Sequence, residues 1–464
     1  MDRRRFILSA GAAAGVVGTG LTGYSSMNVV AATPWALKLQ PARYALTEGI
    51  TEKMVSFSPD APPAVIRMKQ GVPFSADVTN GLTDYTTLHW HGIRVPNKMD
   101  GVPYLTQFPL AENETYRYSF TPEDAGTYWY HPHCMTMEQM ARGLTGIIIV
   151  EEKDPPSVDA DIAVNLRDFR LQPDGQFYPK LFTARGAARA GTKGTVITAN
   201  WQQEYIEDAP SGGLARLRLV ATDPTRIYKL VLAGAEGKII ALDGHPLEKT
   251  RPVPTAKNPL ILSPGQRADL VLKMPEAEGQ EVVVSTLLGY EPHVLARLRS
   301  KGASRSRDLR DLKSLAPNPI SVPDLAAAER QELIFGWSPE GNGTQNGFCG
   351  SFGYTFWSIN KTPWAGDAVS GTEPLVTMQR GKSYILTLRN ESPNQHPIHL
   401  HGLTFRVLKS NQGPVTPIWT DTVLLRKNEI VDIALVADNP GDWAFHCHVI
   451  EHQKSGLAGF VRVI

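Results

Sequence analysis

The placement of histidine is the feature of this sequence with the clearest chemical meaning. Ten of the 12 histidines lie in four short clusters, and the last cluster also holds Cys447. The clusters are HWHG at 89–92, HPH at 131–133, HPIHLHG at 396–402 and HCHVIEH at 446–452. Because side chains alternate along a β-strand, each H-x-H pair presents both imidazoles to one face. So many imidazoles, with a single thiolate, predict a polynuclear copper site.

The elements that must position these residues are short strands. The chain has 464 residues, which is too long for one core and predicts about three domains. Strand-like runs bounded by turn residues recur, helical periodicity is scarce, and Gly (40) and Pro (35) are abundant. We therefore expect an all-β chain of Greek-key sandwiches. A net charge of +1 gives no reason to expect nucleic acid or an acidic membrane surface as a partner.

The first 32 residues form a separate segment. Arg3, Arg4, Arg5 and Phe6 precede an apolar run rich in glycine and alanine, and Ala31-Ala32 offers a small-residue cleavage site. This pattern is typical of a twin-arginine signal peptide. A membrane anchor is the alternative, but the run is short and interrupted by glycines, so we expect no stable membrane span. The mature protein is predicted to be periplasmic or secreted.

The two ends of the chain repeat each other. His89 and His91 align with His399 and His401, and the segment 126–133 aligns with 441–448. The repeat predicts two related domains, at 33–153 and 316–464, around a middle domain at 154–315. That middle domain lacks the clustered histidines, which indicates a structural spacer.

The repeat is also informative where it fails. His396, Cys447 and His452 of the C-terminal copy align with Thr86, Pro132 and Met137 of the first. One cysteine and two histidines are the ligands of a blue-copper electron-transfer site. The C-terminal domain is therefore predicted to hold one mononuclear copper in addition to its share of the polynuclear site.

In order and spacing, the four clusters resemble those of the multicopper oxidases, which include laccases and cuprous oxidases. The resemblance spans the mature chain. It implies three cupredoxin-like Greek-key β-sandwich domains in tandem and four copper ions: one type 1, one type 2 and two type 3. The implied type 1 ligands are His396, Cys447 and His452, and the implied type 2 ligands are His89 and His399. The implied type 3 ligands are His91, His131, His133, His401, His446 and His448.

The resemblance also implies a reaction. Single electrons from a small-molecule reductant enter at type 1 copper, pass through Cys447 to its neighbours, and reduce O2 to water at the other three ions. Phenols and aromatic amines are the leading substrates. A cuprous oxidase of periplasmic copper tolerance is the alternative, although this chain lacks the long methionine-rich insertion common in those enzymes. A copper-free cell-division scaffold is a third reading, but such relatives have lost the ligands. We expect a monomer.

Four further positions bear on the chemistry. Leu457 stands where the family carries its axial methionine or a leucine, and leucine cannot coordinate, so the resemblance implies a higher reduction potential than methionine would give. Asp100 resembles the family's acid near type 2 copper; the alternative is a turn aspartate before glycine. Bacterial relatives often carry a proton-donating glutamate after the last histidine ligand. Here that position holds Gln453, which cannot donate a proton, so Glu451 or another group would have to supply protons instead.

Other residues are left with open alternatives. Cys134 and Cys349 could form a disulfide or remain buried thiols. Met135, Met137 and Met140 are interpreted as packing residues, with a Cu(I) entry patch as the alternative. Residues Trp419, Asp421 and Trp443 are interpreted as strand and core residues, with a substrate-facing loop around Trp419 as the alternative. His245 and His293 are interpreted as ordinary core histidines.

Overall fold

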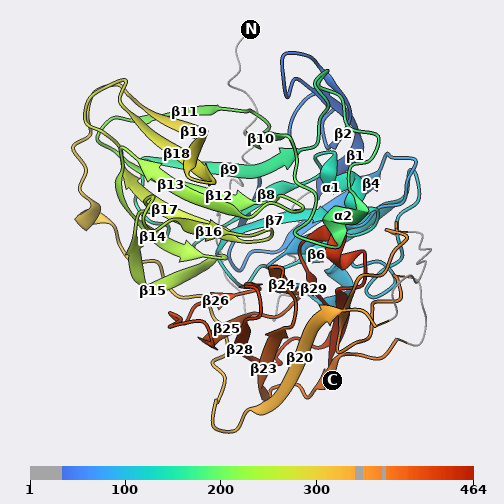
Figure 1. Cartoon of the computed structure of the whole chain (residues 1–464). Coiled ribbons are helices and arrows are strands. Elements are labelled where there is room, and N and C mark those ends of the chain that lie inside the picture. The colour runs from blue at the N-terminus through green and yellow to red at the C-terminus, as the bar shows by residue number, and fades with distance from the viewer. Residues whose placement is uncertain (1–33, 340–348, 351, 368–371) are drawn as a thin grey trace, which may run out of the picture. The chain divides into compact units, whose positions relative to one another are not determined.

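The computed structural model describes residues 34–339, 349–350, 352–367 and 372–464. The predicted signal peptide, 1–32, lies outside these residues. Within them, six β-sheets fall into three consecutive groups, which confirms the all-β prediction (Figure 1). The boundaries predicted near residues 153 and 315 lie in the segments between these groups. No helix in the described part of the chain is both long and apolar enough to cross a membrane.

Domain 1 is a sandwich of two four-stranded sheets, ordered β2-β1-β4-β6 and β3-β8-β7-β5. Its strands are β1 (Trp35–Tyr44), β2 (Thr51–Ser56), β3 (Ile66–Lys69), β4 (Phe74–Asn80), β5 (Leu88–His91), β6 (Thr115–Phe120), β7 (Gly126–Pro132) and β8 (Gly146–Glu151). In β4, alternate residues are buried, from Phe74 through Ala76 and Val78, because one face of the strand packs on the core. The helices η1 (Asn97–Met99) and α1 (Thr136–Ala141) are short.

Domain 2 packs a six-stranded sheet, β10-β9-β12-β17-β14-β15, on a five-stranded one, β11-β19-β18-β13-β16. Its strands are β9 (Ala160–Phe169), β10 (Val196–Ala199), β11 (Tyr205–Pro210), β12 (Leu214–Ala221), β13 (Tyr228–Ala233), β14 (Glu236–Leu242), β15 (His245–Pro252), β16 (Leu260–Leu262), β17 (Arg267–Lys273), β18 (Glu281–Leu288) and β19 (Glu291–Lys301). Its helices are α2 (Ala184–Ala187) and η2 (Leu309–Asp311). Every residue of β12 is buried. Arg218 of β12 contacts Thr127 of domain 1, so the outer face of this strand is an interface between domains.

Domain 3 repeats the plan, with a six-stranded sheet, β21-β20-β23-β28-β25-β26, and a five-stranded one, β22-β30-β29-β24-β27. Its strands are β20 (Glu329–Trp337), β21 (Trp357–Ile359), β22 (Val376–Met378), β23 (Ser383–Asn390), β24 (His396–Leu400), β25 (Phe405–Ser410), β26 (Trp419–Thr420), β27 (Thr422–Leu425), β28 (Ile430–Val436), β29 (Gly441–Cys447) and β30 (Ala458–Val463). Helix α3 (Ile450–Gln453) follows β29 and carries His452. The core between the two sheets contains Cys447 and Leu457.

A disulfide joins Cys134, just after β7, to Cys349, just before β21. It therefore links domain 1 to domain 3 across a sequence separation of 215 residues. The sequence left open whether Cys134 and Cys349 form a disulfide or remain buried thiols, and the structure shows the disulfide. Met140, on α1, is fully buried and Met137 packs beside it, which supports packing roles for these methionines.

Removing this disulfide should lower stability, because it closes a very long loop in the unfolded chain. For the double variant Cys134→Ala, Cys349→Ala we expect a loss of about 4 kcal/mol, which corresponds to an unfolding temperature lower by roughly 5–10 °C. Scanning calorimetry measures the shift. Each single variant should lower the temperature as much as the double variant does. A double variant that unfolds at the wild-type temperature would contradict the prediction.

Candidate metal centre

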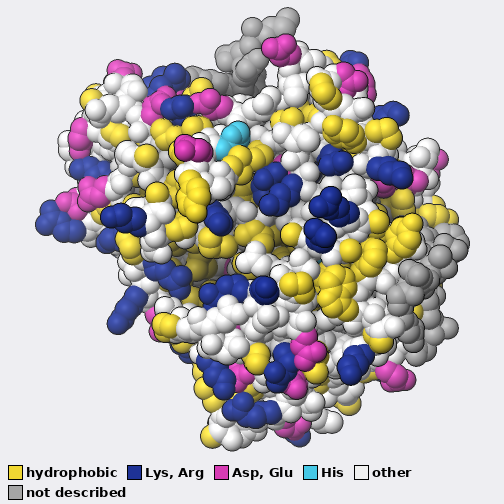
Figure 2. Space-filling model, viewed as in Figure 1, with side chains coloured by type: hydrophobic (Ala, Val, Ile, Leu, Met, Phe, Trp, Pro, Cys, Tyr) yellow, Lys and Arg dark blue, Asp and Glu magenta, His cyan; other side chains and the backbone are white. Residues whose placement is uncertain are grey.

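Four strands carry most of the clustered histidines. In domain 1, β5 pairs with β7 so that His89 lies opposite His131. In domain 3, β24 pairs with β29 so that His399 lies opposite His446. Each pair of strands therefore presents a patch of imidazoles, and the two patches face each other across the interface between the terminal domains. Figure 2 shows little histidine colour on the visible face of the molecule, in keeping with the burial of these residues.

Across this interface, eight imidazoles form one continuous cluster, whose closest ring pairs are His89 with His401 and His91 with His399, at 3.8 Å between centroids in each case. Within it, two groups of three and one further pair each join the two terminal domains. In the first group, the ring centroid of His131 lies 5.8 Å from that of His91 and 5.2 Å from that of His448. The second group joins His133, His401 and His446, with centroids 5.1–5.3 Å apart. The rings of His89 and His399 lie 5.8 Å apart. Each group draws residues from both terminal domains, as a shared site requires.

The ring nitrogens of these histidines fit metal ions. In several of them, one nitrogen is committed to hydrogen bonding: Nδ1 of His89 donates to the Asp100 carbonyl (2.7 Å) and Nδ1 of His399 to the Asp421 carbonyl (2.9 Å). Their opposite nitrogens are buried with no hydrogen-bond partner among the described residues. The same holds for Nδ1 of His91, Nε2 of His131, and both nitrogens of His133 and His448. Buried nitrogens left unpaired in this number are costly without a ligand, whereas metal ions would satisfy them.

Burial keeps most of these imidazoles neutral. Burial, with repulsion from neighbouring histidines, lowers the pKa of His133, His401 and His448 well below the usual value. The pKa of His446 falls to about 3, again chiefly through burial. Neutral imidazole is the form that binds a metal, because the lone pair of one ring nitrogen is then available.

A second cluster lies within domain 3. The Nδ1 atoms of His396 and His452 are 3.1 Å apart, and the Sγ atom of Cys447 lies 3.6 and 3.5 Å from them. All three side chains are fully buried. Burial raises the pKa of the Cys447 thiol, so a cation is needed to hold the thiolate. Two imidazoles and one thiolate converging in an apolar site suit a blue-copper centre.

The two clusters are joined through one tripeptide. Cys447 belongs to the mononuclear cluster, His446 to the group with His133 and His401, and His448 to the group with His91 and His131. Alternation along β29 explains the arrangement, since the side chain of Cys447 points opposite to those of its neighbours. Leu457 is buried in the same core as Cys447, and its carbonyl accepts the Cys447 N–H at 3.0 Å.

Two buried carboxylates contact the histidines of the larger cluster. Asp100 is fully buried, and its Oδ2 atom lies 2.9 Å from Nδ1 of His401, while its Oδ1 atom lies 3.2 Å from Nδ1 of His89. Asp421 places Oδ1 3.1 Å from Nε2 of His91. Both aspartates can therefore orient metal ligands and fix their tautomers.

Asp421 is a functional residue that sequence reasoning missed. It was interpreted as a strand or core residue; it is indeed buried, but it also contacts His91 and His399. Its partner is Arg267 of domain 2, whose guanidinium donates to both carboxylate oxygens at 2.9 and 2.7 Å. Domain 2 thus supports the cluster directly. A charged residue between short apolar strands was the only signal in the sequence.

The remaining candidate acid lies elsewhere. The Glu451 carboxylate accepts hydrogen bonds from the backbone N–H and the hydroxyl of Thr192 and from the hydroxyl of Thr225, all in domain 2. No described contact joins it to a clustered histidine ring, so its part in proton supply stays a prediction. Gln453 is buried, and its Oε1 atom has no hydrogen-bond partner among the described residues. His245, buried beside Asn318, is an ordinary core histidine as predicted.

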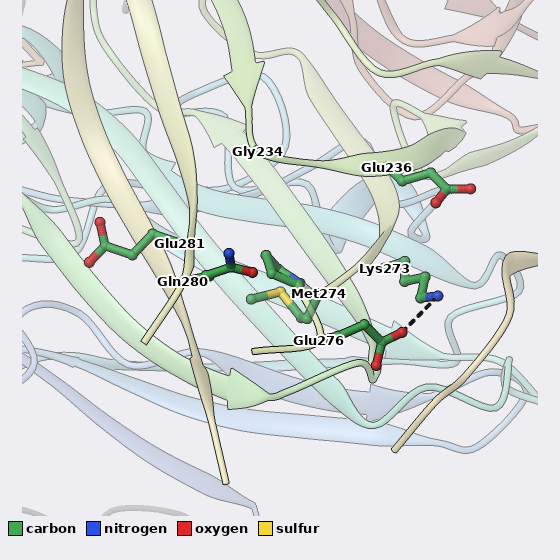
Figure 3. Close-up of a pocket in the computed structure, with 8 residues that line it drawn as sticks. Gly234, Glu236, Lys273, Met274, Glu276, Gln280 and Glu281 are labelled. Carbon is green, nitrogen blue, oxygen red and sulfur yellow. Dashed lines mark ion pairs between the residues drawn. The ribbon is translucent and has the colours of Figure 1, made fainter. Parts of the chain in front are cut away.

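The hollow in Figure 3 is separate from both clusters. It has a volume of about 470 Å³ and lies in domain 2, between residues 234–236 and 273–281. Lys273 and Glu276 form an ion pair across part of its lining (2.9 Å). None of its lining residues contacts a clustered histidine in the described structure, so it is no part of the metal centre.

Comparison with known proteins decides the family. A multi-copper oxidase from Pseudomonas parafulva is 38% identical in sequence, with a TM-score of 0.81 over 93% of this chain and 100% of that one. A multi-copper oxidase from Pseudomonas thermotolerans is 36% identical, with a TM-score of 0.82 over the same shares. The chain belongs to the multicopper oxidases. Two multicopper oxidase family models match residues 38–155 and 348–464. The multicopper oxidase MmcO of Mycobacterium tuberculosis is 28% identical over 90% of this chain and 84% of its own length.

As a multicopper oxidase, this protein binds four copper ions, of types 1, 2 and 3, and is an oxidoreductase that uses a small-molecule reductant and O2. When bound, the copper ions accept electrons one at a time and deliver them to O2. The described residues supply two buried nitrogen-rich clusters for them, and the copper-free scaffold reading does not apply.

Proposed function

We propose that this multicopper oxidase is a laccase-like enzyme, which works as a monomer on phenols and aromatic amines. His396, Cys447 and His452 would hold type 1 copper, and His89 and His399 type 2 copper. The type 3 pair would be held by two groups: His91, His131 and His448, and His133, His401 and His446. The converging nitrogens of His133, His401 and His446, and the ring contacts of His448 with His91 and His131, support this assignment.

The observation that carries the substrate class is the covering of the type 1 cluster. A segment of domain 2, residues 183–192, lies over it: the Arg189 carbonyl accepts a hydrogen bond from Nε2 of His452 at 2.6 Å. This segment contains no methionine, histidine or cysteine. Cu(I) is recognised by such soft ligands. The indole of Trp357, which lies 4.9 Å from His396 and stacks on Trp337, suits aromatic donors instead. The arrangement favours a laccase over a cuprous oxidase.

A direct comparison of substrates tests the proposal. Oxygen consumption by the copper-loaded enzyme would be measured with 2,6-dimethoxyphenol and with Cu(I), at the same oxygen concentration. We expect the phenol to give the higher kcat/KM. A higher value for Cu(I) would contradict the proposal and favour the cuprous oxidase.

The axial position offers a second test. Leu457 lies in the apolar core with Cys447, and replacing it by methionine adds a thioether that stabilises Cu(II). For Leu457→Met we expect a lower type 1 reduction potential, by on the order of 60 mV, which is a tenfold shift in a one-electron equilibrium. Redox titration of the blue absorption measures it. An unchanged or raised potential would show that residue 457 is not axial.

Proton supply is proposed to involve Asp100 and Glu451. The contacts support Asp100 more directly, because its carboxylate lies against both a proposed type 2 ligand and a proposed type 3 ligand. Glu451 remains the candidate that would replace the acid missing at Gln453.

Export through the twin-arginine route is also proposed. The supporting observations are the sequence Arg3-Arg4-Arg5-Phe6 and the Cys134–Cys349 disulfide, because such bonds persist in oxidising compartments. Cell fractionation, with the mass of the mature chain, tests this: recovery of the uncleaved chain in the cytoplasm would contradict it.

A further inference from the structure

Two stacked tryptophans connect the protein surface with the type 1 cluster. Trp337, the last residue of β20, lies directly opposite Trp357, the first residue of β21. Their ring centroids are 4.1 Å apart and their planes differ by only 16°. Trp337 is 45% exposed, whereas Trp357 is fully buried. The pair therefore has one ring at the surface and one in the core.

The buried member of the pair lies against the type 1 histidines. The centroid of the Trp357 ring is 4.9 Å from that of His396 and 4.9 Å from that of His452. Its indole N–H donates to the Ala187 carbonyl at 2.7 Å, which fixes the ring under the segment 183–192. Trp337 is therefore connected to two proposed copper ligands, His396 and His452, by ring contacts through Trp357.

An electron donor cannot contact the type 1 histidines, His396 and His452, directly. The nitrogen of His452 that points away from Cys447 is bonded to the Arg189 carbonyl, and that of His396 to the Ser392 hydroxyl at 2.8 Å. Both imidazoles are fully buried. An electron donor in solution cannot touch either ring in this structure, so its electron must cross an intervening group.

We propose that Trp337 is the docking platform for the aromatic electron donor, and that electrons reach type 1 copper through the stacked rings of Trp337 and Trp357. The inference rests on the proposed laccase function. One phenol stacks on the exposed indole, loses one electron and releases its hydroxyl proton to water. The type 1 copper that His396, Cys447 and His452 would hold would accept that electron as Cu(II) and become Cu(I), and neither tryptophan is consumed. Stacked rings shorten the gap for electron tunnelling, and a planar donor stacks favourably on an indole.

The first test measures electron entry without oxygen. The copper-loaded enzyme is mixed anaerobically with 2,6-dimethoxyphenol, and the bleaching of the type 1 absorption is followed by stopped flow. For Trp337→Leu we expect bleaching slower by about 3- to 10-fold, the effect of losing one aromatic stacking contact. Trp337→Phe should recover most of the rate. The control is Tyr290→Leu, which removes a 99% exposed aromatic side chain from domain 2 and should bleach at the wild-type rate.

The second test measures docking without turnover. In the fully reduced, oxygen-free holoenzyme all copper is diamagnetic Cu(I), so saturation-transfer NMR can detect bound 2,6-dimethoxyphenol. The signal should weaken in Trp337→Leu and persist in Tyr290→Leu. Unchanged bleaching and unchanged saturation transfer in Trp337→Leu would overturn the inference. So would slower bleaching accompanied by altered blue absorption or copper content, which would assign Trp337 a structural role. A wild-type enzyme that is reduced by Cu(I) but not by the phenol would instead overturn the proposed function.

Discussion

Replacing Cys447 by serine is expected to abolish the blue absorption and almost all donor oxidation. Cys447 is the one free cysteine in the described structure, and its Sγ atom lies within 3.6 Å of both proposed type 1 imidazoles. A serine hydroxyl is a hard, neutral ligand that cannot replace a thiolate. We expect oxidation of 2,6-dimethoxyphenol to fall on the order of a thousandfold, equivalent to about 4 kcal/mol of transition-state stabilisation.

Copper analysis shows whether this loss is local. The Cys447→Ser variant should retain three copper ions per chain, because the imidazoles of the larger cluster are untouched. Leu457→Met is the control, since it changes the same site without removing a ligand and should keep the blue absorption. A serine variant that stays blue would show that Cys447 does not bind type 1 copper.

Replacing Asp421 by alanine should give a large loss of stability. Burial alone would raise the pKa of Asp421, but the Arg267 guanidinium holds this pKa well below its usual range, so the group is a buried carboxylate. Its partner Arg267 is fully buried. Removing Asp421 leaves Arg267 with only the more distant carboxylate of Asp243, at 3.6 Å, and costs about 3 kcal/mol. The midpoint of urea unfolding of the copper-free protein should fall accordingly, and the loaded protein should lose copper because His91 and His399 lose a contact.

A surface ion pair in the same domain is the matched control. Asp442 pairs with Arg462, whose side chain is 41% exposed. Asp442→Ala should change stability by no more than about 1 kcal/mol. Asp421→Asn keeps the shape of the side chain, so its loss of stability should lie between those of Asp421→Ala and Asp442→Ala. Equal effects of Asp421→Ala and Asp442→Ala would contradict a special role for the buried pair.

The fold and most of the site could be predicted from the sequence because their signals are local. Alternation on strands accounts for each H-x-H pair and for the opposite orientations of Cys447 and its two neighbours. The repeat between the chain ends aligned His89 with His399, and the resemblance to the multicopper oxidases paired them as type 2 ligands; their ring centroids lie 5.8 Å apart. The spacing alone predicted a polynuclear copper site, and the resemblance to the multicopper oxidases implied the rest of the architecture.

Other parts depend on how the domains meet, which local patterns do not encode. The pairing of Asp421 with Arg267 joins strands of domains 2 and 3, and the disulfide joins domains 1 and 3. The covering of His452 by residues 183–192 likewise comes from another domain. The stack of Trp337 on Trp357 lies within domain 3 but depends on strand register across an intervening segment. Each could be found only once the tertiary arrangement was known.

Anomalous X-ray diffraction at the copper edge, from crystals of the copper-loaded protein, tests the account most directly. It predicts four copper peaks per chain: one among His396, Cys447 and His452, and three between the imidazoles of domains 1 and 3. Peaks confined to one domain, or the absence of a peak beside Cys447, would contradict it.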